Sequence, residues 1–163
     1  KYWENDIKKW KYSGLALVDE VNSLKPRAVL DVGCGYNEFR GKIDNLIGID
    51  PYNDKADLQV GTLEYRTDQK FDVIMCLGSI NFGSRDKILA EVGRCVDLLA
   101  DGGTMFFRVN PGVQHNKPEA KWIEFFAWNV PFIIELSEIF NLKVLDIRDD
   151  SNQRKYFIYR KVK

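Results

Sequence analysis

The chain has 163 residues, of which 45% are apolar and 13% aromatic, so it can bury one sizeable core and is not composed like a disordered segment. Lysine plus arginine and aspartate plus glutamate each number 24, and this neutral total disfavours a general nucleic-acid-coating surface. No apolar run approaches the ~18 residues of a membrane helix, and no signal-peptide pattern opens the chain. We therefore expect a cytoplasmic protein without a membrane partner, built as a single domain over residues 1–163 with a lead-in segment over residues 1–13.

The cysteines Cys34, Cys76 and Cys95 are odd in number and widely spaced, and His115 is the single histidine. A zinc site needs close Cys/His pairs, and a secreted disulfide framework needs an even number of cysteines in a smaller chain. The pattern favours reduced, mostly buried thiols and predicts no metal site. The chain begins at Lys1 without a Met, so we expect part of the native N-terminus to precede it.

Short apolar, β-branched runs alternate with segments of helical periodicity, which is typical of a mostly parallel sheet covered by helices on both faces. Pro26 ends the first helix, and Asp101-Gly102-Gly103 is expected to break a later helix before the next strand. The last two strands are joined by a tight turn at 149–152, so they must form an antiparallel hairpin. In chain order, the predicted elements are a helix over 15–24, a strand over 28–32, a short helical stretch over 38–43, strands over 46–50, 57–60 and 71–76, a helix over 85–99, a strand over 104–109, a helix over 132–140, and strands over 143–148 and 155–162.

The turn Gly33-Cys34-Gly35 follows the first predicted strand, at the end of the sheet where ligands of open α/β folds bind. Glycines there permit a tight turn and let a ligand approach the backbone. Asp50 ends the second strand and can accept two hydrogen bonds from a ribose diol. A dinucleotide needs a third glycine where Glu38 stands, and a carboxylate there repels a pyrophosphate. Asp31, just before the turn, instead suits the cationic amino-acid end of S-adenosylmethionine.

Several segments of the chain resemble motifs of the class I S-adenosylmethionine-dependent methyltransferases and follow one another in the same order. Asp31–Gly35 resembles motif I, Gly48–Asp50 carries the ribose acid, Phe71–Ile74 resembles the fourth strand, and Leu98–Gly103 precedes the fifth. The resemblance covers the chain from Ala16 to the C-terminus. It implies a Rossmann-like, doubly wound α/β fold with a mostly parallel seven-stranded sheet in the order 3-2-1-4-5-7-6, strand 7 antiparallel, and S-adenosylmethionine as cofactor.

The resemblance also implies cofactor contacts at particular residues of this chain. By part of the cofactor, these are Asp31, Gly33, Cys34, Gly35, Leu77 and Gly78 for the methionine end, Asp50 for the ribose hydroxyls, and Pro51, Tyr52, Thr62 and Leu63 for the adenine.

The chain departs from the family pattern in its turn, its first crossover and its adenine contact. Asn37 stands where a third glycine is usual, and asparagine tolerates the left-handed backbone that such a turn needs. The interval from Asp31 to Asp50 is shorter than usual by about four residues, one helical turn, which predicts a stunted first crossover helix. Thr62 stands where an aspartate commonly reads the adenine amino group, so we expect modest cofactor affinity.

The resemblance implies a methyltransferase, and the small chain favours a small-molecule or carrier-bound acceptor such as a sugar, nucleotide or metabolite. The Asn/Asp-Pro-Pro-aromatic motif of amino-methylating DNA and protein-glutamine enzymes is absent from Leu77–Phe82, so nucleic acid is a disfavoured partner. Two alternatives stay open. One is a non-catalytic binding or scaffold module, which the Asn37 and Thr62 departures motivate; the other is an NAD-dependent oxidoreductase, which Glu38 disfavours.

A catalytic base is optional for methyl transfer, because the cofactor supplies the electrophile. His115 is the one candidate base, since its pKa suits neutral pH, but a loop histidine is more often solvated or a capping residue. Nearby aromatic side chains either cover the substrate or belong to the core or to a homodimer contact, the second reading being favoured. These are Trp122, Phe125, Phe126 and Trp128, and the lead-in aromatics Trp3, Trp10 and Tyr12 are candidates for folding over the cofactor.

Overall fold

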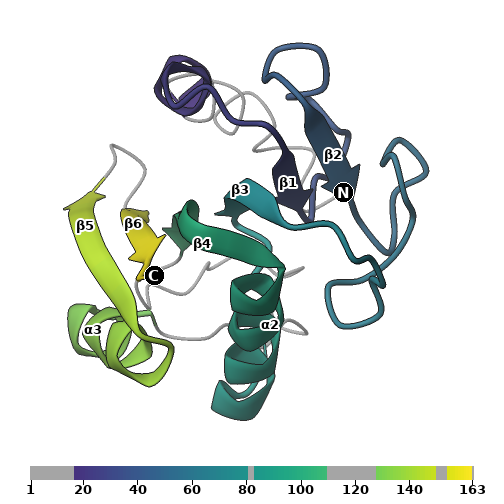
Figure 1. The fold of residues 1–163 in the computed structure, drawn as a ribbon. Coiled ribbons are helices and arrows are strands. Elements are labelled where there is room, and N and C mark those ends of the chain that lie inside the picture. Colours follow the sequence, from purple (N-terminus) through teal and green to yellow (C-terminus); the bar gives the residue numbers. More distant parts are fainter. Residues whose placement is uncertain (1–16, 81–82, 110–127, 150–153, 163) are drawn as a thin grey trace.

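The computed structural model describes residues 17–80, 83–109, 128–149 and 154–162. Its described strands form one six-stranded sheet in the order β2-β1-β3-β4-β6-β5 (Figure 1). Neighbours among β1 to β4 pair in parallel, whereas β6 is antiparallel to both β4 and β5. The elements are β1 (Val29–Val32), β2 (Leu46–Ile49), β3 (Phe71–Leu77), α2 (Arg85–Leu98), β4 (Leu99–Val109), α3 (Val130–Ile139), β5 (Leu142–Asp149) and β6 (Lys155–Lys161).

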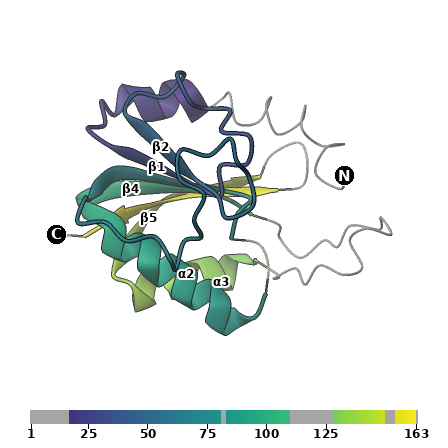
Figure 2. The ribbon, with the colours of Figure 1, turned by 90° about the vertical axis from the view of Figure 1, so that its right-hand side faces the viewer.

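Helices cover both faces of this sheet. Figure 2 shows α2 and α3 on one face and the helical residues 17–23 on the other. Side chains of β1 divide between two apolar clusters accordingly: Leu30 and Val32 join the cluster beneath α2 and α3, and Val29 joins the cluster with Leu17 and Val21. This two-layered burial explains why the strands read as continuous apolar runs in the sequence. None of the helices in the described part of the chain has the length and apolar character that crossing a bilayer requires.

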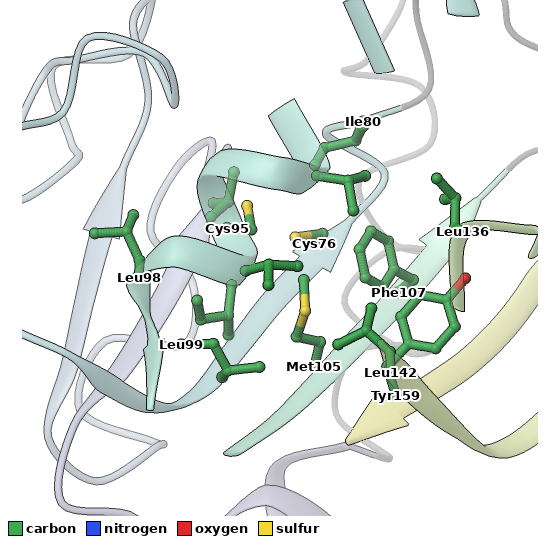
Figure 3. Close-up of a cluster of buried hydrophobic side chains, with 14 of the residues drawn as sticks. Cys76, Ile80, Cys95, Leu98, Leu99, Met105, Phe107, Leu136, Leu142 and Tyr159 are labelled. Carbon is green, nitrogen blue, oxygen red and sulfur yellow. The ribbon is translucent and has the colours of Figure 1, made fainter. Parts of the chain in front are cut away.

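The core beneath α2 and α3 is rich in aromatic side chains. Phe107 of β4 stacks on Phe157 of β6 with ring centroids 4.7 Å apart, and Trp128 is fully buried beside them. The ring N–H of Trp128 donates to the carbonyl of Ile80 at 2.8 Å. Trp128 is therefore a core residue, in agreement with the interpretation that the sequence favours for these aromatic side chains. Cys76 and Cys95 are free thiols buried in the same cluster, with their sulfurs turned toward each other (Figure 3).

The order of the sheet is confirmed, but its predicted size is wrong. The described residues form six strands rather than seven, because the expected strand 57–60 makes only a single bridge, Ile49 to Leu58. At this edge the Gly48 N–H donates to the Asp57 carboxylate at 2.8 Å. The Asp57 carboxylate thus accepts the hydrogen bond that a backbone carbonyl of a third strand would have accepted. Regular strand pairing stops there.

Two other predicted boundaries are also corrected. The segment 38–43 contains turns and an isolated bridge rather than a short helix. Asn37, directly before this segment, and Gly41, within it, have φ of +59° and +80°, which a right-handed helix does not admit. Strand β4 begins at Leu99 and runs through Asp101-Gly102-Gly103, with an irregularity in its pairing to β3, so these residues interrupt the register and not the strand.

Candidate cofactor site

The loops after β1, β2 and β3 lie together at the carboxyl ends of three neighbouring parallel strands. The N–H groups of Gly33 and Cys34 both donate to the Ile49 carbonyl, at 2.8 and 2.9 Å. The N–H of Gly35 donates to Asp50 Oδ2 at 3.0 Å. The structure therefore places the glycine turn against the end of β2.

Asp50 is held by backbone donors on both sides. Its Oδ1 accepts the N–H of Tyr52 at 2.8 Å, while Oδ2 accepts that of Gly35. Each carboxylate oxygen has a second lone pair, so the side chain can still accept two hydrogen bonds from a diol. This fixed orientation is what a ribose-binding carboxylate requires.

Gly33 is required where the loops after β1 and β3 meet. Its φ is +68°, and a Cβ at this position would lie 2.3 Å from the Cβ of Ser79. A side chain at position 33 would therefore push the two loops apart. The buried hydroxyl of Ser79 has no hydrogen-bond partner among the described residues, which leaves it able to bond to a group bound at this turn.

The site is strongly acidic. Asp31 is only 3% exposed, and burial, followed by repulsion from Asp50, raises the pKa of its carboxyl to about 7. Burial and the carboxylates of Asp31, Asp50 and Asp57 raise the pKa of Cys34 to about 12, so this thiol stays neutral and is a poor nucleophile. A cation placed here would relieve the repulsion between the carboxylates, and an anion would add to it.

The same turn lacks the features of a phosphate site. Phosphate-binding glycine turns offer free backbone N–H groups at the N-terminus of a helix. Here the N–H groups of Gly33, Cys34 and Gly35 are all engaged by the end of β2, and turns rather than a helix follow at 35–39. The geometry therefore disfavours a dinucleotide pyrophosphate.

The residues predicted to surround the adenine lie beside Asp50. Tyr52 is 92% exposed, so its ring is free to cover a bound ligand. A Cβ on Gly61 would lie 3.9 Å from the Cβ of Pro51, which places the turn holding the buried Thr62 and the exposed Leu63 next to Pro51. These side chains offer apolar surface with two hydroxyls, those of Tyr52 and Thr62.

Two residues predicted to contact the methionine end of the cofactor lie at the end of β3 and directly after it. Leu77 is buried at the end of the strand. Gly78 has a φ of +86° and donates its N–H to the Arg108 carbonyl at 2.8 Å, which ties this loop to β4. The Gly78 N–H is thus engaged within the sheet.

Asn37 adopts the left-handed backbone that its position predicted, with a φ of +59°. Its Nδ2 donates to the Lys55 carbonyl and to Asp57, both at 3.2 Å, and so links the turn to the segment after β2. Asp57 and Ser79 were not predicted as site residues. Ser79 directly follows Gly78 and could have been included as part of the same loop, whereas Asp57 reads as an ordinary strand residue.

The remaining candidates lie outside the described residues, namely His115, Trp122, Phe125, Phe126, Trp3, Trp10 and Tyr12. A hollow of about 380 Å³ lies at the other end of the strands, opposite to their carboxyl ends. It is lined by residues that include Pro26, Asp72, Gly103 and Arg160. Ligands of open α/β sheets bind at the carboxyl ends of the strands, so this hollow is not the predicted site.

No protein-family model and no curated protein sequence matches this chain. Solved structures do match. The N-methyltransferase NodS from Bradyrhizobium japonicum WM9 matches with a TM-score of 0.72 and 14% identity, over 97% of this chain and 99% of that one. The 1,6-didemethyltoxoflavin-N1-methyltransferase from Burkholderia thailandensis, with bound S-adenosylhomocysteine, matches with a TM-score of 0.72 and 15% identity, over 91% and 77%.

The magnesium protoporphyrin IX methyltransferase from Synechocystis PCC 6803, with bound S-adenosylmethionine, also has a TM-score of 0.72, at 10% identity over 96% of this chain and 82% of that one. Sequence identities this low carry no information on substrate, but the shared arrangement of strands spans nearly the whole chain. The protein therefore has the class I methyltransferase fold, in a form with six described strands.

Proposed function

We propose that this protein binds S-adenosylmethionine at the carboxyl ends of β1 and β2 and transfers its methyl group to a small-molecule or carrier-bound acceptor. The observation that carries the proposal is the charge and donor pattern of the glycine turn. Asp31 and Asp50 lie behind a turn whose N–H groups are already used, which suits a cationic ligand with a diol and not a phosphate. Two structurally similar methyltransferases were crystallised with this cofactor or its demethylated product, which supports the same choice.

When bound, S-adenosylmethionine supplies an electrophilic methyl group on a cationic sulfur, so the protein mainly needs to position it and the acceptor. Asp50 would hold the ribose through the two lone pairs that its backbone contacts leave open. Asp31 would stabilise the cationic end from behind the turn, and the Ser79 hydroxyl would bond to the same end. The exposed ring of Tyr52 would cover the adenine.

We retain His115 as the proposed general base for acceptors that lose a proton on methylation. Its replacement by alanine should lower the rate of methyl transfer and leave cofactor affinity unchanged. If the rate is unaffected with an oxygen or nitrogen acceptor, His115 has no catalytic role.

Calorimetric titration with S-adenosylmethionine and S-adenosylhomocysteine tests the cofactor part of the proposal, with NADH as a negative control. Binding of both adenosine ligands, weakened in an Asp50→Ala variant, is the expected result. A product screen with a labelled methyl donor against metabolite, glycan and RNA pools then identifies the acceptor.

A non-catalytic binding or scaffold module is the second candidate. One observation favours it: both oxygens of Asp50 already accept backbone N–H groups, so the carboxylate has a structural role without any ligand. If neither S-adenosylmethionine nor S-adenosylhomocysteine binds at millimolar concentration, the result would favour this alternative over the methyltransferase.

A further inference from the structure

A polar cluster around Asp57 lies beside the glycine turn, where the helix expected over 38–43 and the strand expected over 57–60 do not form. Asp57 Oδ2 accepts two hydrogen bonds, from the Gly48 N–H at 2.8 Å and from the Asn37 side-chain amide at 3.2 Å. The other oxygen of Asp57 lies 3.5 Å from the Arg40 guanidinium. One carboxylate therefore joins β2 to the segment that carries the glycine turn.

Asn37 is the member of this cluster that reaches the turn. It is 6% exposed, and its backbone N–H donates to the Cys34 carbonyl at 2.9 Å. Its Nδ2 donates to Asp57 and to the Lys55 carbonyl, each at 3.2 Å. The end of the turn is thus fixed both from within and by the segment that follows β2.

Gly48 provides the space that Asn37 needs above β2. A Cβ at position 48 would clash with Asn37 Oδ1 and would lie 2.9 Å from Cys34 Sγ. Glycine weakens the interior of a strand and often marks a place where another part of the chain comes close. The strand therefore contains a glycine at the position where Asn37 reaches Asp57.

The segment that contains Asp57 also contacts the proposed ribose acid. The Asp50 N–H donates to the Leu58 carbonyl at 3.3 Å, and the Gly35 N–H donates to Asp50 Oδ2 at 3.0 Å. Asp57 and Leu58 thus hold both sides of the proposed ribose site. Asp57 holds the turn through Asn37, and the Leu58 carbonyl holds the backbone of Asp50.

The glycine turn has a backbone shape that a free chain rarely adopts. Gly33, Gly35 and Asn37 all have positive φ, at +68°, +57° and +59°. Positive φ is unfavourable for residues that carry a Cβ, and even asparagine adopts it only occasionally. No helix supports the turn, because residues 35–39 form further turns. Hydrogen bonds from outside the turn must therefore fix its shape to the accuracy that a binding site requires.

We propose that Asp57 is a positioning residue for the cofactor: through Asn37 it holds the glycine turn where Gly35 orients Asp50 toward the ribose hydroxyls. This inference rests on the proposed binding of S-adenosylmethionine and deepens it. Both lone pairs of Asp57 Oδ2 are used within the protein, and Oδ1 faces Arg40. Asp57 therefore acts through its neighbours and not by contact with the ligand.

Calorimetric titration with S-adenosylhomocysteine tests this role in variants of the cluster. Asp57→Ala should weaken binding about tenfold, the effect of one lost hydrogen bond to a charged group. Asp57→Asn should keep most of the affinity, because its amide oxygen can accept the same two hydrogen bonds. An equal loss in both variants would show that the charge of Asp57 matters and not the position of the turn, and would overturn the proposal.

Asn37→Gly is the milder second variant, since it keeps the left-handed backbone and removes only the side-chain hydrogen bonds. It should weaken binding as Asp57→Ala does, and it decides the question if Asp57→Ala does not fold. Unchanged affinity in Asn37→Gly would overturn the proposal. In an Asp50→Ala background, Asp57→Ala should cost little further affinity, because both residues act through one contact; fully additive losses would contradict this.

Asp72→Ala is the matched control. Asp72 is a partly buried aspartate whose carboxylate also accepts a backbone N–H from a distant segment, that of Arg27 at 2.7 Å. It lies near the amino end of β3, away from the glycine turn. Its replacement should lower stability and leave cofactor affinity unchanged. A loss of affinity equal to that of Asp57→Ala would assign the effect to general destabilisation and overturn the proposal.

The amide signal of Gly35 in proton–nitrogen NMR spectra of the free protein reports the hydrogen bond to Asp50 without any cofactor. In Asp57→Ala and Asn37→Gly this proton should shift upfield and exchange faster with solvent, and in Asp72→Ala it should do neither. An unshifted Gly35 signal would overturn the inference whether or not the cofactor binds. Failure of the proposed function would look different, as no binding of S-adenosylhomocysteine to the wild-type protein, and a shifted signal would then still support the role of Asp57 in holding the turn.

Discussion

Asp31 provides the sharpest test, because its buried carboxyl is expected to resist ionisation in the folded protein. Burial and the nearby Asp50 raise its pKa from 3.8 to about 7. Between these two values the folded state binds a proton that the unfolded state has lost, so stability must fall as pH rises through this range. Above pH 7 both states are ionised and this contribution no longer changes.

The magnitude follows from the size of the shift. Each pKa unit corresponds to about 1.4 kcal/mol, so raising the pH from 5 to 8 should lower the free energy of unfolding by about 2–3 kcal/mol through Asp31 alone. An Asp31→Asn variant keeps the side-chain shape but cannot ionise, so its stability should lack this slope. Urea denaturation of both proteins at pH 5 and pH 8 measures the difference.

Other titrating groups are common to both proteins and cancel in the comparison. Glu91→Gln is a comparison variant, since burial, partly offset by Lys87, also raises the pKa of Glu91 on α2. This variant should lose only the contribution of Glu91 to the slope and keep that of Asp31. Wild-type and Asp31→Asn proteins with equal pH slopes would refute the assignment of a high pKa to Asp31.

Asp50→Ala should weaken S-adenosylmethionine binding by about 1.5–3 kcal/mol, the value for hydrogen bonds to a charged group. If calorimetry finds unchanged affinity, Asp50 is not the residue that binds the ribose. Affinity for S-adenosylmethionine should rise up to about tenfold per pH unit between pH 6 and pH 7, because its cationic amino-acid end favours ionised Asp31; an affinity that does not change over this pH range, measured by calorimetry, would contradict this. Gly33→Ala should lower both stability and cofactor affinity, since its Cβ would meet Ser79, whereas Gly35→Ala has open space and should cost only about 1 kcal/mol for its left-handed backbone, measured by thermal unfolding and titration.

The main elements were predictable because they depend on local patterns. The apolar runs at β1 and β3 and the helical period of α2 predicted their positions to within a residue or two. Asn37 was also predictable in kind, since few other residues tolerate a positive φ. Asp57 was not, because only the folded chain shows its carboxylate bonded to the Gly48 N–H, where it replaces a backbone partner.

The sequence by itself determined the class of the protein: an alternating pattern of buried strands and helices, with a glycine turn after the first strand and an acid after the second. Tertiary structure alone decided that the N–H groups of the turn are bonded to Ile49 and Asp50, and that Asp31 is buried beside a second carboxylate. The physical reason is that spacing along a chain fixes local periodicity, whereas charge, burial and donor satisfaction depend on neighbours brought together from distant strands.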